Sequence, residues 1–163
     1  MSTPADLRPL IDRLEIEALC AQFTDAVMMH DFHRLATLFT DDAVLRIPDA
    51  GIEVSGRAQF EPSMRRMQDA WDYFVQHTHP GATTIDGDTA TGRAHVCEFG
   101  RLRTGSSHLN YAIYHDRYRR TPDGWKFTER VYEIRYLDNS PLPGSPPGED
   151  GAGVDIAALQ QHG

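Results

Sequence analysis

The sequence predicts an α+β fold, in which N-terminal helices pack against a strongly curved, mostly antiparallel sheet that encloses a pocket. In the N-terminal part, apolar residues recur at intervals of three and four, the period of an amphipathic helix. The second half contains long alternating segments separated by short turns with Asp, Pro and Gly, which is typical of hairpins. Helices followed by a run of strands indicate the α+β class, and a long twisted sheet should curl around the helices.

The composition restricts the classes of function. The 163 residues favour one domain. The net charge of −8 and the pI near 5.4 argue against nucleic acid and anionic membranes as partners, since both attract basic proteins. No apolar run approaches the roughly 20 residues of a membrane-spanning helix. No signal peptide is visible, so we expect a cytoplasmic protein, and Cys20 and Cys97 match no metal or redox spacing.

Three helices are expected before the sheet. The first begins near Leu10, after a flexible leader over residues 1–9. Its apolar stripe consists of Ile16, Leu19, Cys20, Phe23, Ala26 and Val27. Residues 30–39 form a second, short helix with Asp31 as its N-cap, and residues 57–71 form a third.

The strands follow in order. Residues 40–56 are expected to form a short strand, a turn and another strand segment, and residues 72–80 form one strand. Residues 82–103 and 107–137 form two hairpins with Asp-Gly turns. Residues 10–138 are therefore expected to be the folded domain.

The remaining residues, 139–163, are rich in Pro and Gly. A segment of this composition is not expected to pack a core of its own. We therefore expect a C-terminal tail that is either flexible or laid over a neighbouring surface.

Three segments together resemble one family. They are FTDAVMMHDFHRLATLFTDDA, DGDTATGR and YHDRYRRTPDGWKFTER, and the resemblance covers about residues 10–137. Together and in order, they are similar to the SnoaL-like branch of the nuclear-transport-factor-2-like superfamily. The resemblance implies a cone-shaped α+β barrel with a deep pocket, usually a homodimer. Members include polyketide cyclases, ketosteroid isomerases, dehydratases, epoxide hydrolases and binding proteins, and most of the enzymes need no cofactor. Function must therefore be inferred from the pocket residues.

The catalytic positions that the resemblance implies are only partly kept. Phe23 stands where the dehydratases and isomerases carry a Tyr, Met28 where the dehydratases carry a catalytic Asp, and Ile47 where the isomerases carry their Asp base. Asp116 matches the oxyanion-hole Asp of ketosteroid isomerases, which is held protonated in an apolar site and donates a hydrogen bond. The dehydratase histidine corresponds to His77, or to His79 if no residue is deleted in the match.

The histidine pair in QHTHPG also invites an interpretation from the residues alone. His77 and His79 lie two positions apart and share one face of a strand. A metal site needs further ligands, and Thr83 and Thr84 stand where a downstream carboxylate would be required, so no metal is predicted. Proton transfer suits histidine near pH 7, although the pair could also be a solvated strand end before Pro80.

Strand alternation extends the candidate site from Asp116. If Asp116 faces the pocket, so should His108, Asn110, Ala112 and Tyr114, whereas Tyr111, Ile113 and His115 face outward and suggest a dimer surface. Asp116 could instead only anchor its hairpin through a neighbouring Arg. Glu98 and His95 lie on opposite faces, so at most one of them faces the pocket. The expected substrate-binding residues are Phe23, Val27, Met28, Ile47, Met64, Trp71, Glu98, His108, Asn110 and Tyr132.

These observations favour an enzyme without a cofactor that acts on a hydrophobic small molecule of secondary-metabolite type. The reaction would be cyclisation, isomerisation or dehydration by general acid–base catalysis. His77 or His79 would move the proton, and Asp116, together with Tyr114, would stabilise a developing oxyanion. An epoxide-opening hydrolase or cyclase and a binding protein without catalysis are the alternatives.

Overall fold

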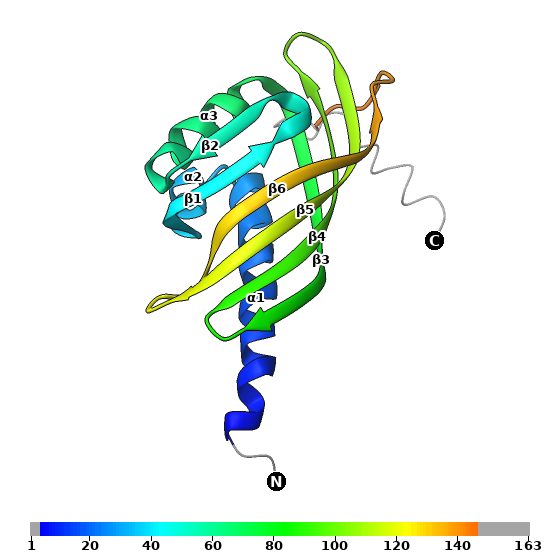
Figure 1. Ribbon diagram of the computed structural model, residues 1–163. Helices are drawn as coiled ribbons and strands as arrows, with labels where there is room; N and C mark the ends of the chain where they lie inside the picture. The colour runs from blue at the N-terminus through cyan, green and yellow to red at the C-terminus, as the bar shows by residue number, and fades with distance from the viewer. Residues whose placement is uncertain (1–3, 147–163) are drawn as a thin grey trace, which may run out of the picture.

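Helices and a single six-stranded sheet make up the computed structural model, which describes residues 4–146 (Figure 1). The helices are α1 (Pro4–Met28), α2 (Phe32–Thr37) and α3 (Phe60–Asp69), with 3-10 turns at Pro48–Ala50 and Arg57–Gln59. The strands are β1 (Phe39–Ile47), β2 (Ile52–Ser55), β3 (Trp71–Asp86), β4 (Thr89–Leu102), β5 (Ser107–Thr121) and β6 (Gly124–Asp138). The sheet order is β2-β1-β6-β5-β4-β3, with β1 and β6 parallel and every other neighbouring pair antiparallel. The α+β class is confirmed.

The core lies between α1 and the face of the sheet that curves around it (Figure 1). All six residues of the expected α1 stripe are buried, because a helix with one apolar face can remove that face from water only against the sheet. Aromatic rings fill the space beside the stripe: the ring centroid of Phe39 lies 4.0 Å from that of Phe60 and 5.2 Å from that of Phe127. No helix in the described part of the chain is long and apolar enough to cross a membrane.

Two expected boundaries differ from the structure. The leader over residues 1–9 is wrong from Pro4 onward, where α1 begins, since proline is well accommodated at the first position of a helix. The strand expected to end at Pro80 continues to Asp86. Because β3 is an edge strand, it tolerates a residue without an N–H, and the register shifts between Pro80 and Thr83.

Two further expectations concern the short second helix and the tail. Asp31 caps α2 as expected, accepting a hydrogen bond from the backbone N–H of Arg34 at 3.1 Å. Residues 139–146 form neither helix nor strand, and the backbone N–H of Leu142 donates to Ser107 Oγ at 3.1 Å. The rest of the expected tail lies outside the described residues.

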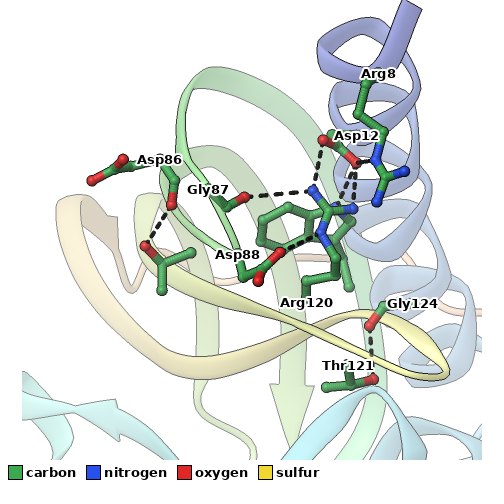
Figure 2. A network of polar contacts seen from close by, with 10 residues as sticks. Arg8, Asp12, Asp86, Gly87, Asp88, Arg120, Thr121 and Gly124 are labelled. Carbon is green, nitrogen blue, oxygen red and sulfur yellow. Dashed lines mark hydrogen bonds and ion pairs between the residues drawn. The ribbon is translucent and has the colours of Figure 1, made fainter. Parts of the chain in front are cut away.

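A polar network around Arg120 ties α1 to the end of the sheet (Figure 2). Nη1 and Nη2 of Arg120 donate to the two carboxylate oxygens of Asp12 at 2.6 and 2.7 Å, and Nε donates to Asp88 in the β3–β4 turn at 2.9 Å. Trp125 donates its indole N–H to Asp12 at 3.2 Å, and the guanidinium carbon of Arg120 lies 4.5 Å from the Trp125 ring. Asp12 is only 3% exposed, so its charge depends on these donors.

Replacing Asp12 by asparagine should lower the free energy of unfolding at pH 7 by about 2 kcal/mol, the typical scale of charged hydrogen bonds. The hydrogen bonds from Arg120 hold the pKa of Asp12 below its usual range; burial opposes this effect and Trp125 adds to it. A lowered carboxyl pKa stabilises the fold above the unfolded-state pKa, and this stabilisation is lost as the pH falls through the folded-state pKa. Urea unfolding should therefore show the two proteins converging below about pH 4.

The matched control is Asp88→Asn. Asp88 bonds the same guanidinium, but its side chain is 81% exposed, so its loss should cost less than about 0.5 kcal/mol. An Asp12→Asn deficit that stays the same from pH 7 to pH 3 would contradict the assignment of this stabilisation to the ion pair.

Candidate active site

An apolar cavity of about 450 Å³ lies between α1, α3 and the inner face of the sheet. Ten residues expected to face the pocket line it. From the helices and β1 they are Phe23, Val27, Met64 and Ile47. From the long strands they are Trp71, Glu98, His108, Asn110, Tyr114 and Tyr132. The walls are mainly aliphatic and aromatic, so the cavity suits a hydrophobic ligand.

One cluster of polar side chains in this cavity surrounds Glu98. On neighbouring strands, Gln76 of β3 stands opposite Glu98 of β4, which in turn stands opposite Asn110 of β5. Gln76 Nε2 donates to Glu98 Oε2 at 2.9 Å, and Asn110 Nδ2 donates to Glu98 Oε1 at 3.2 Å. The hydroxyl of Tyr132 donates to the same Oε1 at 2.6 Å. Three donors therefore fix the carboxylate in place.

The phenols beside Glu98 are in their neutral form at physiological pH. Burial, and then the negative charge of Glu98, raises the pKa of Tyr132 well above its usual range. Burial also raises the pKa of Tyr114, whose ring centroid lies 5.1 Å from that of Tyr132. The site therefore combines a fixed carboxylate, which can accept a proton, with phenol hydroxyls, which can donate hydrogen bonds.

The structure does not bring His77 and His79 to this cavity. They share one face of β3, as expected, but it is the exposed outer face. Gln76, which precedes His77, and Thr78, which lies between the two histidines, point inward. Thr78 accepts a hydrogen bond from Thr24 of α1 at 2.7 Å. Because side chains alternate along a strand, His77 and His79 cannot lie on the inner face when Gln76 and Thr78 do. The expectation that His77 or His79 moves a proton in the pocket is wrong, because neither lines it.

Asp116 also lies outside the cavity lining, although it is buried as expected. Nε and Nη2 of Arg130 donate to its carboxylate at 2.8 and 3.0 Å, and Tyr118 donates at 3.0 Å. Arg130 is fully buried, and its guanidinium carbon lies 4.3 Å from the Phe23 ring and 3.8 Å from the Tyr114 ring. Asp116 therefore accepts hydrogen bonds inside a buried ion pair, as in the anchoring alternative, and is not a donor to a ligand.

Two further expectations concern Met28 and the faces of β5. Met28 does not line the cavity; its sulfur accepts a hydrogen bond from the backbone N–H of Gln76 at 3.1 Å. The alternation on β5 is confirmed: Asn110 and Tyr114 are buried, whereas Tyr111 is exposed.

Gln76 was not expected in the site; its position opposite Glu98 depends on strand register, which the sequence pattern does not reveal.

A long helix against the concave face of a curved sheet, with an apolar cavity between them, defines a class of α+β cone proteins. An NTF2-like protein of Novosphingobium aromaticivorans has this fold; it is 26% identical, with a TM-score of 0.67, and the match covers 91% of this chain and 93% of that one. The chain belongs to the family of SnoaL-like domains, whose family model matches residues 8–131. This membership confirms the resemblance to the NTF2-like superfamily.

Other relatives indicate what such a domain can be. The chain is 27% identical over 124 residues to an uncharacterised protein of Mycobacterium tuberculosis, Rv2910c, covering 74% of this chain and 83% of that protein. It is 26% identical to LinA, with a TM-score of 0.78 and coverage of 87% of this chain and 99% of that one. A second LinA structure is named as a hexachlorocyclohexane dehydrochlorinase. Proteins with this fold therefore include a dehydrochlorinase.

Proposed function

We propose that this protein is an enzyme that removes a proton from a hydrophobic small molecule, with Glu98 as the base. The reaction class is elimination or isomerisation, which general acid–base catalysis can perform without a cofactor. One observation carries the proposal: Glu98 is a carboxylate fixed by three donors in a mainly apolar cavity. A base placed in this way meets a bound substrate without reorganising.

The proposed step uses two kinds of group. Glu98 takes a proton from carbon, and the electrons of the broken C–H bond form a new double bond. In an elimination, the leaving group departs with the electrons of its own bond; in an isomerisation, the charge collects on a carbonyl oxygen. Tyr114, a neutral phenol in the cavity wall, is proposed to donate a hydrogen bond to the atom that gains charge.

The alternative of a binding protein without catalysis also has a specific observation in its favour. The positions at which the family resemblance implies a Tyr and two Asp carry Phe23, Met28 and Ile47, and both histidines point outward. The same apolar cavity would then only hold its ligand. Epoxide opening and cyclisation remain within the same acid–base chemistry, and product analysis separates them from elimination.

Incubation with two probes distinguishes catalysis from binding. Chloride release from γ-hexachlorocyclohexane reports elimination, and deuterium uptake from D₂O beside the carbonyl of bicyclic ketones reports proton abstraction. We expect turnover in at least one assay that is lost in Glu98→Gln and kept in Glu133→Gln, a change on the outer face. Probes that bind but are recovered without chemical change or deuterium would favour the binding protein; full turnover in Glu98→Gln would identify another base.

We also propose a homodimer formed through the outer face of the sheet. Tyr111 and Tyr136 are 50% and 53% exposed, and their ring centroids lie 6.1 Å apart on neighbouring strands. Exposed aromatic pairs of this kind are typical of interfaces. Tyr111→Arg should shift the protein from dimer to monomer in light scattering, whereas Met29→Arg, at a position 70% exposed just after the end of α1, should not. A wild-type monomer at tens of micromolar would contradict this proposal.

A further inference from the structure

Two buried oxygen atoms beside Glu98 have no hydrogen-bond partner among the described residues. They are the side-chain oxygens of Gln76 and Asn110. Gln76 is 4% exposed and Asn110 is 9% exposed, and both side chains line the cavity. A buried carbonyl oxygen without a donor costs free energy, so such atoms in a binding cavity require an explanation.

The orientation of these two amides follows from Glu98. An ionised carboxylate only accepts hydrogen bonds, so each amide must turn its NH₂ group toward Glu98. Rotating either amide by half a turn would place a carbonyl oxygen against a carboxylate oxygen, and the two would repel. Gln76 and Asn110 therefore direct their oxygens elsewhere, and the hydroxyl proton of Tyr132 is also committed to Glu98.

The polar end of the cavity consequently has a surplus of acceptors. One N–H of each amide and the hydroxyl of Tyr132 are bonded to Glu98, and no donor in the described part of the chain reaches either amide oxygen. A ketone, an ether or a hydrocarbon supplies no proton to any of these atoms. A hydroxyl or an amine does.

We propose that Gln76 and Asn110 recognise a hydrogen-bond donor on the substrate, so the substrate class is an apolar ring compound that carries a hydroxyl or amino group. This inference rests on the proposed function in taking the cavity as the substrate site. Binding of the donor would hold the neighbouring carbon beside Glu98, which is what proton abstraction at that carbon requires. Ordered water on both oxygens is the competing explanation, and it gives a donor-bearing ligand no advantage.

A matched ligand series tests the proposal by isothermal titration calorimetry. Fluorene has neither donor nor acceptor, 9-fluorenone and 9-methoxyfluorene only accept, and 9-hydroxyfluorene and 9-aminofluorene donate. We expect at least one of the two donors to bind about tenfold or more tightly than both acceptor-only compounds, because they alone pair the buried oxygens. The hydroxyl and amino compounds distinguish the two sources of the donor. Equal affinities across the series, or no binding by any member, would overturn the proposal.

Variants assign the preference to the two amides. Gln76→Met and Asn110→Leu should each reduce the donor preference to about threefold or less, since each removes one acceptor. Gln68→Met is the matched control: Gln68 is an amide that also lines the cavity, but it makes no bond to Glu98, so the affinity ratio should persist. The new amide of Glu98→Gln can itself donate to one of the oxygens, so this variant should also lose preference. Persistence of the ratio in both Gln76→Met and Asn110→Leu contradicts the proposal.

The result is separable from the fate of the proposed function. None of the five compounds can undergo elimination, so the measurement is an equilibrium affinity and requires no turnover. A donor preference in a protein that converts none of the probes supports the recognition and removes the catalysis. Turnover of the probes without any preference for donor-bearing ligands supports the catalysis and removes the proposed recognition.

Discussion

Replacing Arg130 by methionine is expected to lower the free energy of unfolding by about 3–5 kcal/mol, the scale of a broken buried ion pair. Arg130 is fully buried and donates two hydrogen bonds to Asp116, at 2.8 and 3.0 Å. Methionine can fill the space between the aromatic rings but leaves Asp116 without its opposite charge. Only Tyr118 would still donate to that carboxylate. Guanidinium denaturation followed by circular dichroism measures the loss.

A double-mutant cycle provides the control. Asp116→Asn combined with Arg130→Met removes both charges, so the double variant should regain at least about 2 kcal/mol over Arg130→Met alone. Because Asp116 does not line the cavity, folded Asp116→Asn should retain the turnover and ligand affinity of the wild type. If Arg130→Met is as stable as the wild type, the ion pair contributes nothing; if Asp116→Asn is folded but inactive, the acid role expected from the sequence is restored.

The cross-strand partner of Asp116 could not be predicted from the sequence pattern. Counting back from the turn at Thr121 and Gly124 places Asp116 opposite Glu129, which would repel it. The structure instead has a register irregularity between Arg117 and Tyr118, and this one-residue shift pairs Asp116 with Arg130. Such a bulge depends on packing against the neighbouring strands, so alternation predicted the buried face of β5 but not the partner.

The histidine pair failed for a related reason. On most strands, apolar residues mark the inner face, and the buried α1 stripe and the face of β5 were predicted in that way. Residues 76–79 of β3 are Gln, His, Thr and His, so both faces are polar and the pattern does not indicate which one points inward. On β4, Glu98 and His95 lie on opposite faces, and the sequence pattern likewise does not indicate which of them points inward. Only the pairing of three strands places Glu98 between two amides, and that pairing depends on turn geometry.

Glu98→Gln is expected to lower the turnover number about 10³-fold, within the range that a positioned general base contributes. The Michaelis constant should change much less, because the substitution keeps the shape of the side chain and removes only its ability to accept a proton. The variant should also remain folded, with a free energy of unfolding within about 1 kcal/mol of the wild type. Tyr132 can still donate to the amide oxygen, and Gln76 can rotate to accept from the new NH₂ group.

Two comparisons make this prediction specific to the carboxylate. Glu98→Asp keeps the charge but withdraws it from the three donors, so its activity should lie between that of Glu98→Gln and that of the wild type. Tyr132→Phe removes one donor and leaves the base, so it should reduce turnover less than Glu98→Gln does. If Glu98→Gln lost activity only because it unfolded, the carboxylate itself would not matter. Glu98→Asp would then be either as active as the wild type or as unfolded as Glu98→Gln. The proposed base therefore requires a folded Glu98→Gln protein that still binds its ligand and has lost the chemical step.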